Sequence, residues 1–112
     1  SQYFSYSNDN GDTWTPVAPS TLQSPVSPAS IARIPKTGDL LVVWNDHSNV
    51  GDAIRNRLRT PMTVAISRDE GKTWEKRKNI MADPDGWYCY TGIAFSGDRV
   101  LLTYTAGGKA YD

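Results

Sequence analysis

The chain has 112 residues, its 12 Lys and Arg balance 12 Asp and Glu, and 38% of its residues are hydrophobic. This length suits one folded unit, and the balanced charge gives no reason to expect nucleic acid or an anionic membrane as the main partner. No apolar run approaches the length of a membrane span, no signal-peptide pattern occurs at the N-terminus, and the single cysteine excludes an internal disulfide.

Alternation of apolar and polar residues, punctuated by turn signals, predicts an all-β chain of eight strands without an amphipathic helix. The expected strands are 2–7, 13–15, 30–34, 40–45, 62–67, 73–76, 88–95 and 99–105. The strand at 40–45 is almost continuously apolar, which is typical of a strand buried on both faces. Connections are expected at 16–28, 46–59 and 77–86, and the last contains the turn signal Asp83-Pro84-Asp85-Gly86.

One eight-residue pattern, Ser-x-Asp-x-Gly-x-Thr-Trp, occurs at 7–14 and again 60 positions later at 67–74. Such a recurrence indicates a repeat architecture. Within the pattern, the aspartate can accept backbone hydrogen bonds and close a turn, the glycine supplies a positive φ, and the Thr-Trp pair suits the start of a strand. We therefore interpret these carboxylates as structural; a calcium loop would need further oxygen ligands, including a later bidentate Glu. The fixed positions are Ser7, Asp9, Gly11, Thr13 and Trp14, then Ser67, Asp69, Gly71, Thr73 and Trp74.

The pattern resembles the Asp-box, or BNR repeat, of sialidase-type β-propellers. The resemblance implies that the box joins the third and fourth strands of a four-stranded blade, so eight strands would form part of a six-bladed propeller. Residues 1–16 would then end one blade, 29–77 would form a complete blade, and 87–112 would begin a third. Such a piece has open strand edges. We expect it to be either part of a longer chain or one subunit of a ring built from three copies.

The resemblance also suggests a carboxylate-binding arginine. In sialidase-like propellers, the third of three arginines that bind the substrate carboxylate stands shortly before an Asp-box strand, and Arg59 has this place in Arg59-Thr60-Pro61-Met62. A guanidinium suits the role because it is always charged and binds a carboxylate through two parallel hydrogen bonds. The alternatives are Arg55 or Arg57 in the same role, or a solvated loop arginine without one.

A candidate nucleophile lies in the stretch Tyr88-Cys89-Tyr90-Thr91-Gly92-Ile93. Sialidases carry their nucleophilic tyrosine in a similar stretch, and Tyr90 fits it. These enzymes use a tyrosine where other glycosidases use a carboxylate, and a nearby glutamate activates it. The alternative is an aromatic residue packed in a strand, and strand alternation does not separate Tyr88 from Tyr90.

The other catalytic and substrate-binding residues that the sialidase resemblance implies are not found in the sequence. No glutamate is placed to activate Tyr90, since Glu70 lies in a box and Glu75 just after one. Two further arginines and the acid/base aspartate would come from earlier blades. Asp46 follows a buried strand but has no motif that assigns it a role, and neither His47 nor Cys89 has a partner set for metal binding or nucleophilic chemistry. No metal or cofactor is expected.

The sequence thus favours part of a sialidase-like exo-glycoside hydrolase that removes a terminal acidic sugar, sialic acid, from glycans and is inactive in isolation. The alternatives are a non-catalytic Asp-box module that binds glycan or protein, and a self-assembling propeller subunit. The expected partners are an acidic glycan and either the rest of the propeller or further copies of the chain. The start at Ser1 suggests a position inside a longer reading frame or after processing, and a secreted or periplasmic parent is one option for localisation.

Overall fold

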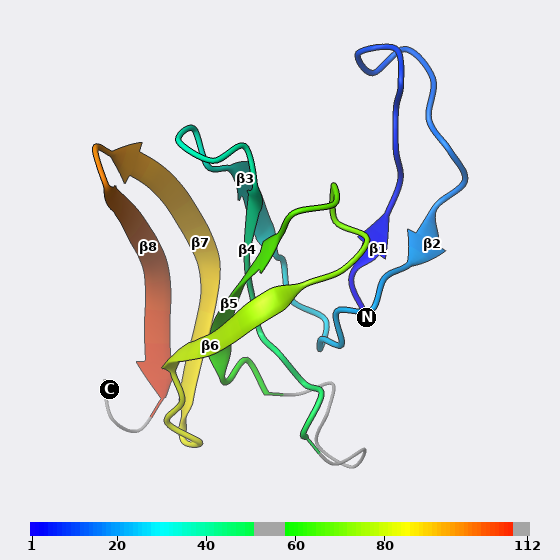
Figure 1. Ribbon diagram of the computed structural model, residues 1–112. Coiled ribbons are helices and arrows are strands. Elements are labelled where there is room, and N and C mark those ends of the chain that lie inside the picture. Colours follow the sequence, from blue (N-terminus) through cyan, green and yellow to red (C-terminus); the bar gives the residue numbers. More distant parts are fainter. Residues whose placement is uncertain (51–57, 109–112) are drawn as a thin grey trace.

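The computed structural model describes residues 1–50 and 58–108, which are all-β and contain no helix (Figure 1). It follows that no membrane-spanning helix is present in these two ranges. Eight strands confirm the predicted fold class. They are β1 (Tyr3–Phe4), β2 (Ala18–Pro19), β3 (Ser30–Arg33), β4 (Leu40–Trp44), β5 (Met62–Ser67), β6 (Glu75–Met81), β7 (Gly86–Ser96) and β8 (Arg99–Gly108).

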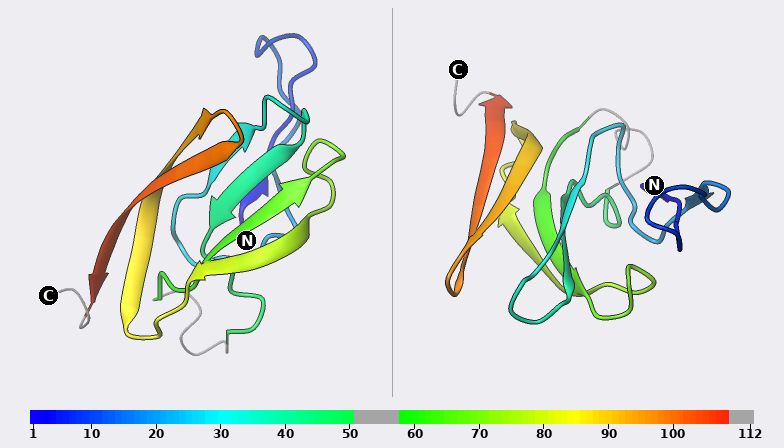
Figure 2. Two further views of the ribbon diagram at one scale, coloured as in Figure 1. Left: turned by 60° about the vertical axis from the view of Figure 1, so that its left-hand side comes forward. Right: turned by 90° about the horizontal axis from the view of Figure 1, so that it is seen from above.

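The strands form three antiparallel sheets in chain order: β1-β2, then β3-β4-β5-β6, then β7-β8. The two-stranded sheets lie at opposite ends of the molecule, on either side of the four-stranded sheet (Figures 1 and 2). The arrangement is consistent with part of a propeller. The division into blades at 1–16, 29–77 and 87–112 remains a prediction.

Both Asp-boxes share the hydrogen bonds of their Ser, Asp, Gly and Thr residues. In the first, Gly11 N–H donates to Ser7 Oγ at 2.8 Å, and Thr13 donates its N–H to Asp9 Oδ1 at 2.8 Å and its hydroxyl to Oδ2 at 2.5 Å. The second box repeats these bonds within 0.1 Å. The box glycines have φ values of 97° and 84°, as the left-handed turn requires.

The strands that leave the boxes differ from the prediction. Residues 13–15 are not a strand: the Thr13 N–H is used within the box by Asp9, and a single backbone bond, from Thr15 N–H to the Tyr6 carbonyl at 2.8 Å, joins this segment to residues 2–7. The ladder with β1 instead forms at β2, inside the expected connection 16–28. After the second box, β6 runs over 75–81 rather than 73–76, with two shifts of register against β5. The prediction ended this strand too early because the charged residues at 76–78 resemble a polar connection.

Two buried clusters join the three sheets. The first contains Leu22, Val42, Trp44 and Ala65, with Phe4 of β1 packed against it, and so lies between the β1-β2 sheet and the four-stranded sheet. The second cluster joins the four-stranded sheet to β7-β8, and its fully buried members are Val43, Met62 and Tyr88. As predicted, β4 is buried on both faces, because its successive residues alternate between the two clusters.

Candidate functional site

Arg59 lies just before β5, and its backbone is fixed to β7. The carbonyl of Arg59 accepts a hydrogen bond from Tyr88 N–H at 2.8 Å. The next residue, Thr60, is buried and donates its hydroxyl to the Asp83 carbonyl at 2.8 Å. These two bonds bring the loop arginine beside the first half of β7, 30 residues later in the chain.

A bulge in β7 turns Tyr90 outward. Cys89 pairs with Thr105 and Gly92 with Thr103, so two residues of β7 oppose one residue of β8. Tyr90 has a φ of 53°, which is uncommon for a residue other than glycine. As a result Tyr88 is fully buried whereas Tyr90 is 63% exposed. The two tyrosines that regular alternation would place on one face are thus separated by the bulge.

The side chains of Arg59 and Tyr90 meet. The Arg59 Cζ atom lies 5.5 Å from the centre of the Tyr90 ring, within the range of a cation–π contact. The guanidinium also donates to Cys89 Sγ at 3.2 Å and to the Val26 carbonyl at 3.4 Å. The Tyr90 side chain, and next the Cys89 thiol, raise the pKa of Arg59 above its ordinary value, because both accept hydrogen bonds from the charged form.

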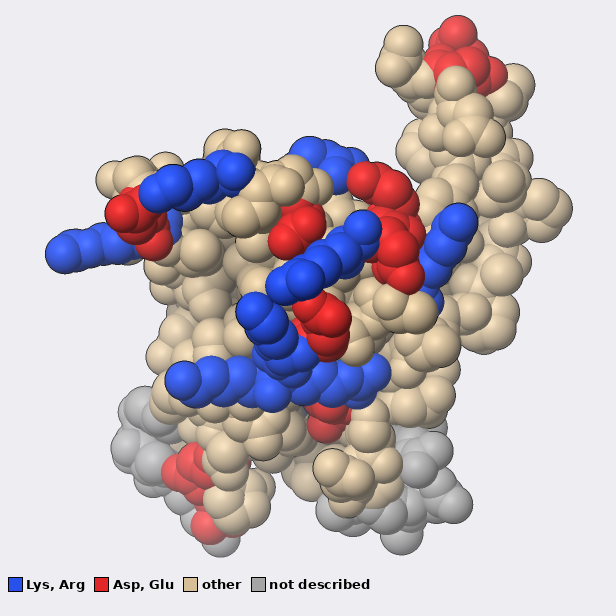
Figure 3. Space-filling view, in the orientation of Figure 1, with Lys and Arg blue, Asp and Glu red and all other residues tan. Residues whose placement is uncertain are grey.

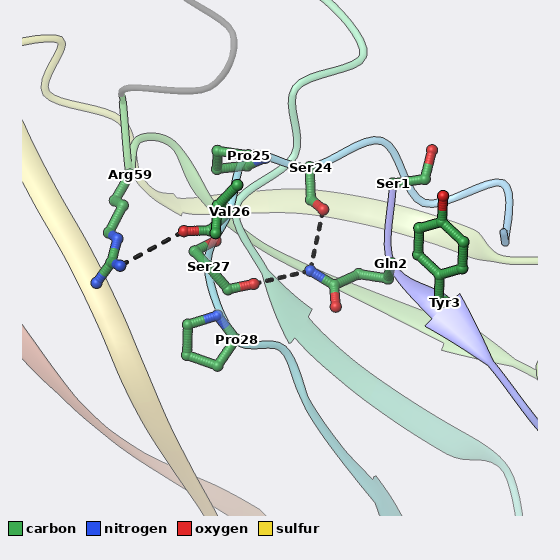
Figure 4. A pocket seen from close by; sticks show the side chains of 9 residues that line it. All are labelled: Ser1, Gln2, Tyr3, Ser24, Pro25, Val26, Ser27, Pro28 and Arg59. Carbon is green, nitrogen blue, oxygen red and sulfur yellow. Dashed lines mark hydrogen bonds between the residues drawn. The ribbon is translucent and has the colours of Figure 1, made fainter. Parts of the chain in front are cut away.

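Arg59 borders a hollow of about 650 Å³ between the N-terminus and the connection 24–28 (Figure 4). In this hollow the amide of Gln2 donates to Ser24 Oγ and to the Ser27 carbonyl, each at 3.0 Å. Arg59 also borders a second hollow of about 460 Å³ against the turn 84–87. Tyr90 does not line either hollow, so Arg59 is the residue that connects the exposed phenol with the concave surface.

Buried polar residues that the sequence did not single out support this arrangement. Asn45 is 2% exposed; its amide donates to the carbonyls of Pro61 and Tyr88, each at 3.0 Å. Ser30 of β3 donates to the Thr91 carbonyl at 2.5 Å and accepts from the Thr91 hydroxyl at 2.8 Å, which fixes the bulge to the neighbouring sheet. A polar residue at the end of the predicted apolar strand 40–45 is the sequence signal for Asn45.

The remaining acidic candidates are engaged elsewhere. Asp46 accepts from Arg77 at 3.2 Å and from the backbone and hydroxyl of Ser48. The chain has only two glutamates: Glu70 forms two hydrogen bonds with Arg33, which lower its pKa, and Glu75 pairs with Arg68 at 2.9 Å. Neither glutamate contacts Tyr90.

His47 is fully buried, and neither of its ring nitrogens has a hydrogen-bond partner among the described residues. Within 1–50 and 58–108 no group of three His, Cys, Asp or Glu could hold a metal ion. Arg55 and Arg57, the alternatives to Arg59, lie outside the described residues.

The fold and the two boxes define an all-β Asp-box repeat protein. A family model described as BNR repeat-like domain matches residues 1–102, and the chain belongs to this BNR repeat-like family. No match to the chain is found among curated proteins or among solved structures.

Proposed function

We propose that the chain is part of a sialidase-like exo-glycoside hydrolase that removes a terminal acidic sugar from glycans. The observation that carries this proposal is the contact between Arg59 and Tyr90, which are 31 positions apart in the chain. A fixed cation beside an exposed phenol at the edge of a hollow is a suitable arrangement for a sugar that carries both a carboxylate and a reactive anomeric carbon.

In this mechanism Arg59 binds the sugar carboxylate through two hydrogen bonds. The Tyr90 oxygen attacks the anomeric carbon while the glycosidic C–O bond breaks, and a general acid from another part of the active site protonates the leaving oxygen. Water then breaks the tyrosyl–sugar bond, and the two inversions retain the configuration. The base for Tyr90 would also come from another part, because both glutamates of this chain are paired with arginines.

A second candidate function is a non-catalytic module that binds an acidic glycan. It is favoured because both glutamates are paired with arginines and neither contacts Tyr90 to activate it. In this case Arg59 holds the carboxylate and Tyr90 offers an aromatic surface to the sugar, and no bond is broken.

Two substitutions in the complete parent protein test both functions. Tyr90→Phe keeps the ring and removes the nucleophilic oxygen, so the kcat for an aryl sialoside should fall by orders of magnitude while sialic acid binding is retained. Arg59→Lys keeps the charge but loses the bidentate geometry, so binding should weaken about tenfold or more. Matched controls are Tyr104→Phe, on the strand opposite the bulge, and Arg99→Lys, at the exposed start of β8.

Turnover and binding that are unchanged in both Tyr90→Phe and Arg59→Lys would contradict the proposal. Binding that depends on Arg59, with no turnover even in the unsubstituted parent, would support the binding module instead.

A further inference from the structure

The smaller hollow beside Arg59, of about 460 Å³, has no role in the mechanism above. Its lining comes from two short stretches of the chain, 58–59 before β5 and 84–87 at the start of β7. Among the described residues that line it, Arg59 is the only cation, and none has a hydroxyl or amide side chain. By contrast, the larger hollow contains the polar side chains of Gln2 and Ser24. The smaller hollow is therefore suited to an apolar surface next to a bound carboxylate.

Trp87 is the largest residue that lines this hollow, and 39% of it is exposed. Across the ladder between β7 and β8, Trp87 pairs with Gly107, and a Cβ added at position 107 would overlap the indole. The indole therefore packs directly over the backbone of β8, a close approach that a glycine permits. An aromatic ring is thus held against the sheet while part of it stays open to the hollow.

The position of Trp87 relative to Arg59 is fixed by hydrogen bonds on both sides of Trp87. Before it, the carbonyl of Asp83 accepts the hydroxyl of Thr60 at 2.8 Å. After it, the N–H of Tyr88 donates to the Arg59 carbonyl at 2.8 Å. The aromatic ring and the cation therefore border the hollow from segments that are bonded to each other, which is the arrangement expected of a preformed binding site.

The charge around the hollow favours a neutral ligand. The turn 83–86 contains Asp83 and Asp85, and Figure 3 shows acidic side chains at the turn after β6, with Lys and Arg side chains gathered over β6 itself. In the proposed function, Arg59 is already occupied by the carboxylate of the terminal sugar. A second acidic group would have no further cation among the described residues that line the hollow, and an unpaired charge is costly to desolvate.

The chemistry of the terminal sugar places its neighbour close to Arg59. In sialic acid the carboxylate is bonded to the anomeric carbon, which also carries the glycosidic oxygen. The next sugar of the glycan therefore begins only a few bonds from the carboxylate that Arg59 binds. Neutral pyranose rings have a face of C–H groups, and such a face packs well against an aromatic ring.

We propose that the smaller hollow is a subsite for the neutral sugar to which the terminal acidic sugar is attached, with the Trp87 indole packed against that sugar ring. This inference rests on the proposed function and narrows its substrate to a sialoside of a neutral sugar.

Two ligands with the same terminal sugar test the subsite. Methyl sialoside ends at the glycosidic oxygen, whereas sialyllactose continues with a neutral sugar. Their Kd values are measured by titration calorimetry on the complete parent protein carrying Tyr90→Phe, so that neither ligand is cleaved. Adding Trp87→Ala should weaken sialyllactose about tenfold and change methyl sialoside by less than about twofold. Gly107→Ala displaces the indole without removing it and should have the same selective effect.

Trp14→Ala is the matched control. Trp14 is an indole that is 63% exposed in the first box and lines neither hollow beside Arg59, so both affinities should stay unchanged. A disialoside, whose second sugar is acidic, should bind no more tightly than methyl sialoside.

An unchanged affinity for sialyllactose in Trp87→Ala, or an equal loss for both ligands, would overturn the subsite while the role of Arg59 stands. A disialoside that binds as tightly as sialyllactose would overturn the preference for a neutral sugar. If the parent binds neither ligand, the proposed function fails, and the subsite fails with it.

Discussion

At the scale of single residues, the two box aspartates stabilise turns. Asp9 and Asp69 each accept two bonds from a threonine and one from a serine hydroxyl. The threonine hydroxyl has the largest effect, followed by the threonine N–H and the serine hydroxyl, and together they lower the pKa of each carboxyl to about 2. A carboxylate that is held ionised in this way is a poor proton donor or acceptor near neutral pH.

This pKa shift predicts how stability changes with acidity. Because the folded pKa is lower than the unfolded value of 3.8, both carboxylates stabilise the fold above about pH 4, and the contribution is lost as the pH falls toward 2. Asp69→Asn should weaken the second box at neutral pH and flatten the change in unfolding free energy between pH 4 and 2. Urea unfolding at several pH values measures both effects.

Asp12→Asn is the matched control for this prediction, because Asp12 occupies a variable position of the first box. It should leave the pH dependence nearly unchanged. If Asp69→Asn and the unsubstituted chain lose the same unfolding free energy between pH 4 and 2, the box carboxylate does not carry the effect.

At the scale of strands, the bulge in β7 determines which tyrosine is available. It inserts one extra residue opposite Tyr104, so Tyr90 faces solvent while Tyr88 remains in the core. The two hydrogen bonds between Ser30 and Thr91 tie the bulge to β3. The position of Tyr90 relative to Arg59 therefore depends on a residue 60 positions away.

Ser30→Ala tests this link. It removes the group that bonds both the carbonyl and the hydroxyl of Thr91, so the unfolding free energy should fall by about 1 kcal/mol. Amide hydrogen exchange should accelerate at 90–92, around the bulge, more than in the rest of β7. Thr37→Ala is a suitable control, because its hydroxyl only accepts the Asp39 N–H in an exposed turn. Equal exchange at 90–92 in both variants would contradict the link.

The strand scale also shows what the sequence could predict. The boxes, the apolar run in β4 and the glycine turns are local signals, and they located most strands. The candidates Arg59 and Tyr90 came from the resemblance to sialidases, and their roles remain predictions. The bulge was not predictable from alternation, because it depends on the bonds to Ser30 across two sheets. β6 was predicted too short, because an exposed edge strand of charged residues resembles a polar connection.

At the scale of the whole molecule, the three sheets share no backbone ladder, so side chains hold them together alongside single backbone bonds such as that from Tyr88 to Arg59. Besides the two apolar clusters, the buried side chain of Asn45 connects separate segments through hydrogen bonds. It donates to the Pro61 carbonyl before β5 and to the Tyr88 carbonyl of β7, and it accepts the Ser27 hydroxyl from the connection at 2.8 Å. One buried amide thus links three segments, and it satisfies groups that would otherwise be costly to bury.

Substitutions at Asn45 test this role through the unfolding free energy and its dependence on pH. Asn45→Ala leaves three partners without a bond and should reduce the unfolding free energy by about 2 kcal/mol or more.

Asn45→Asp places a carboxylate against two carbonyl oxygens in a buried site, so the pKa of the introduced group rises above its unfolded value. A raised pKa means that the protonated form is tolerated below about pH 4 and that stability is lost as the pH rises through the folded pKa. This trend is opposite to that of the box aspartates. The difference in unfolding free energy between Asn45→Asp and the unsubstituted chain should therefore be larger at pH 7 than at pH 4. If that difference is the same at both pH values, the Asn45 amide is not the buried donor that joins the sheets.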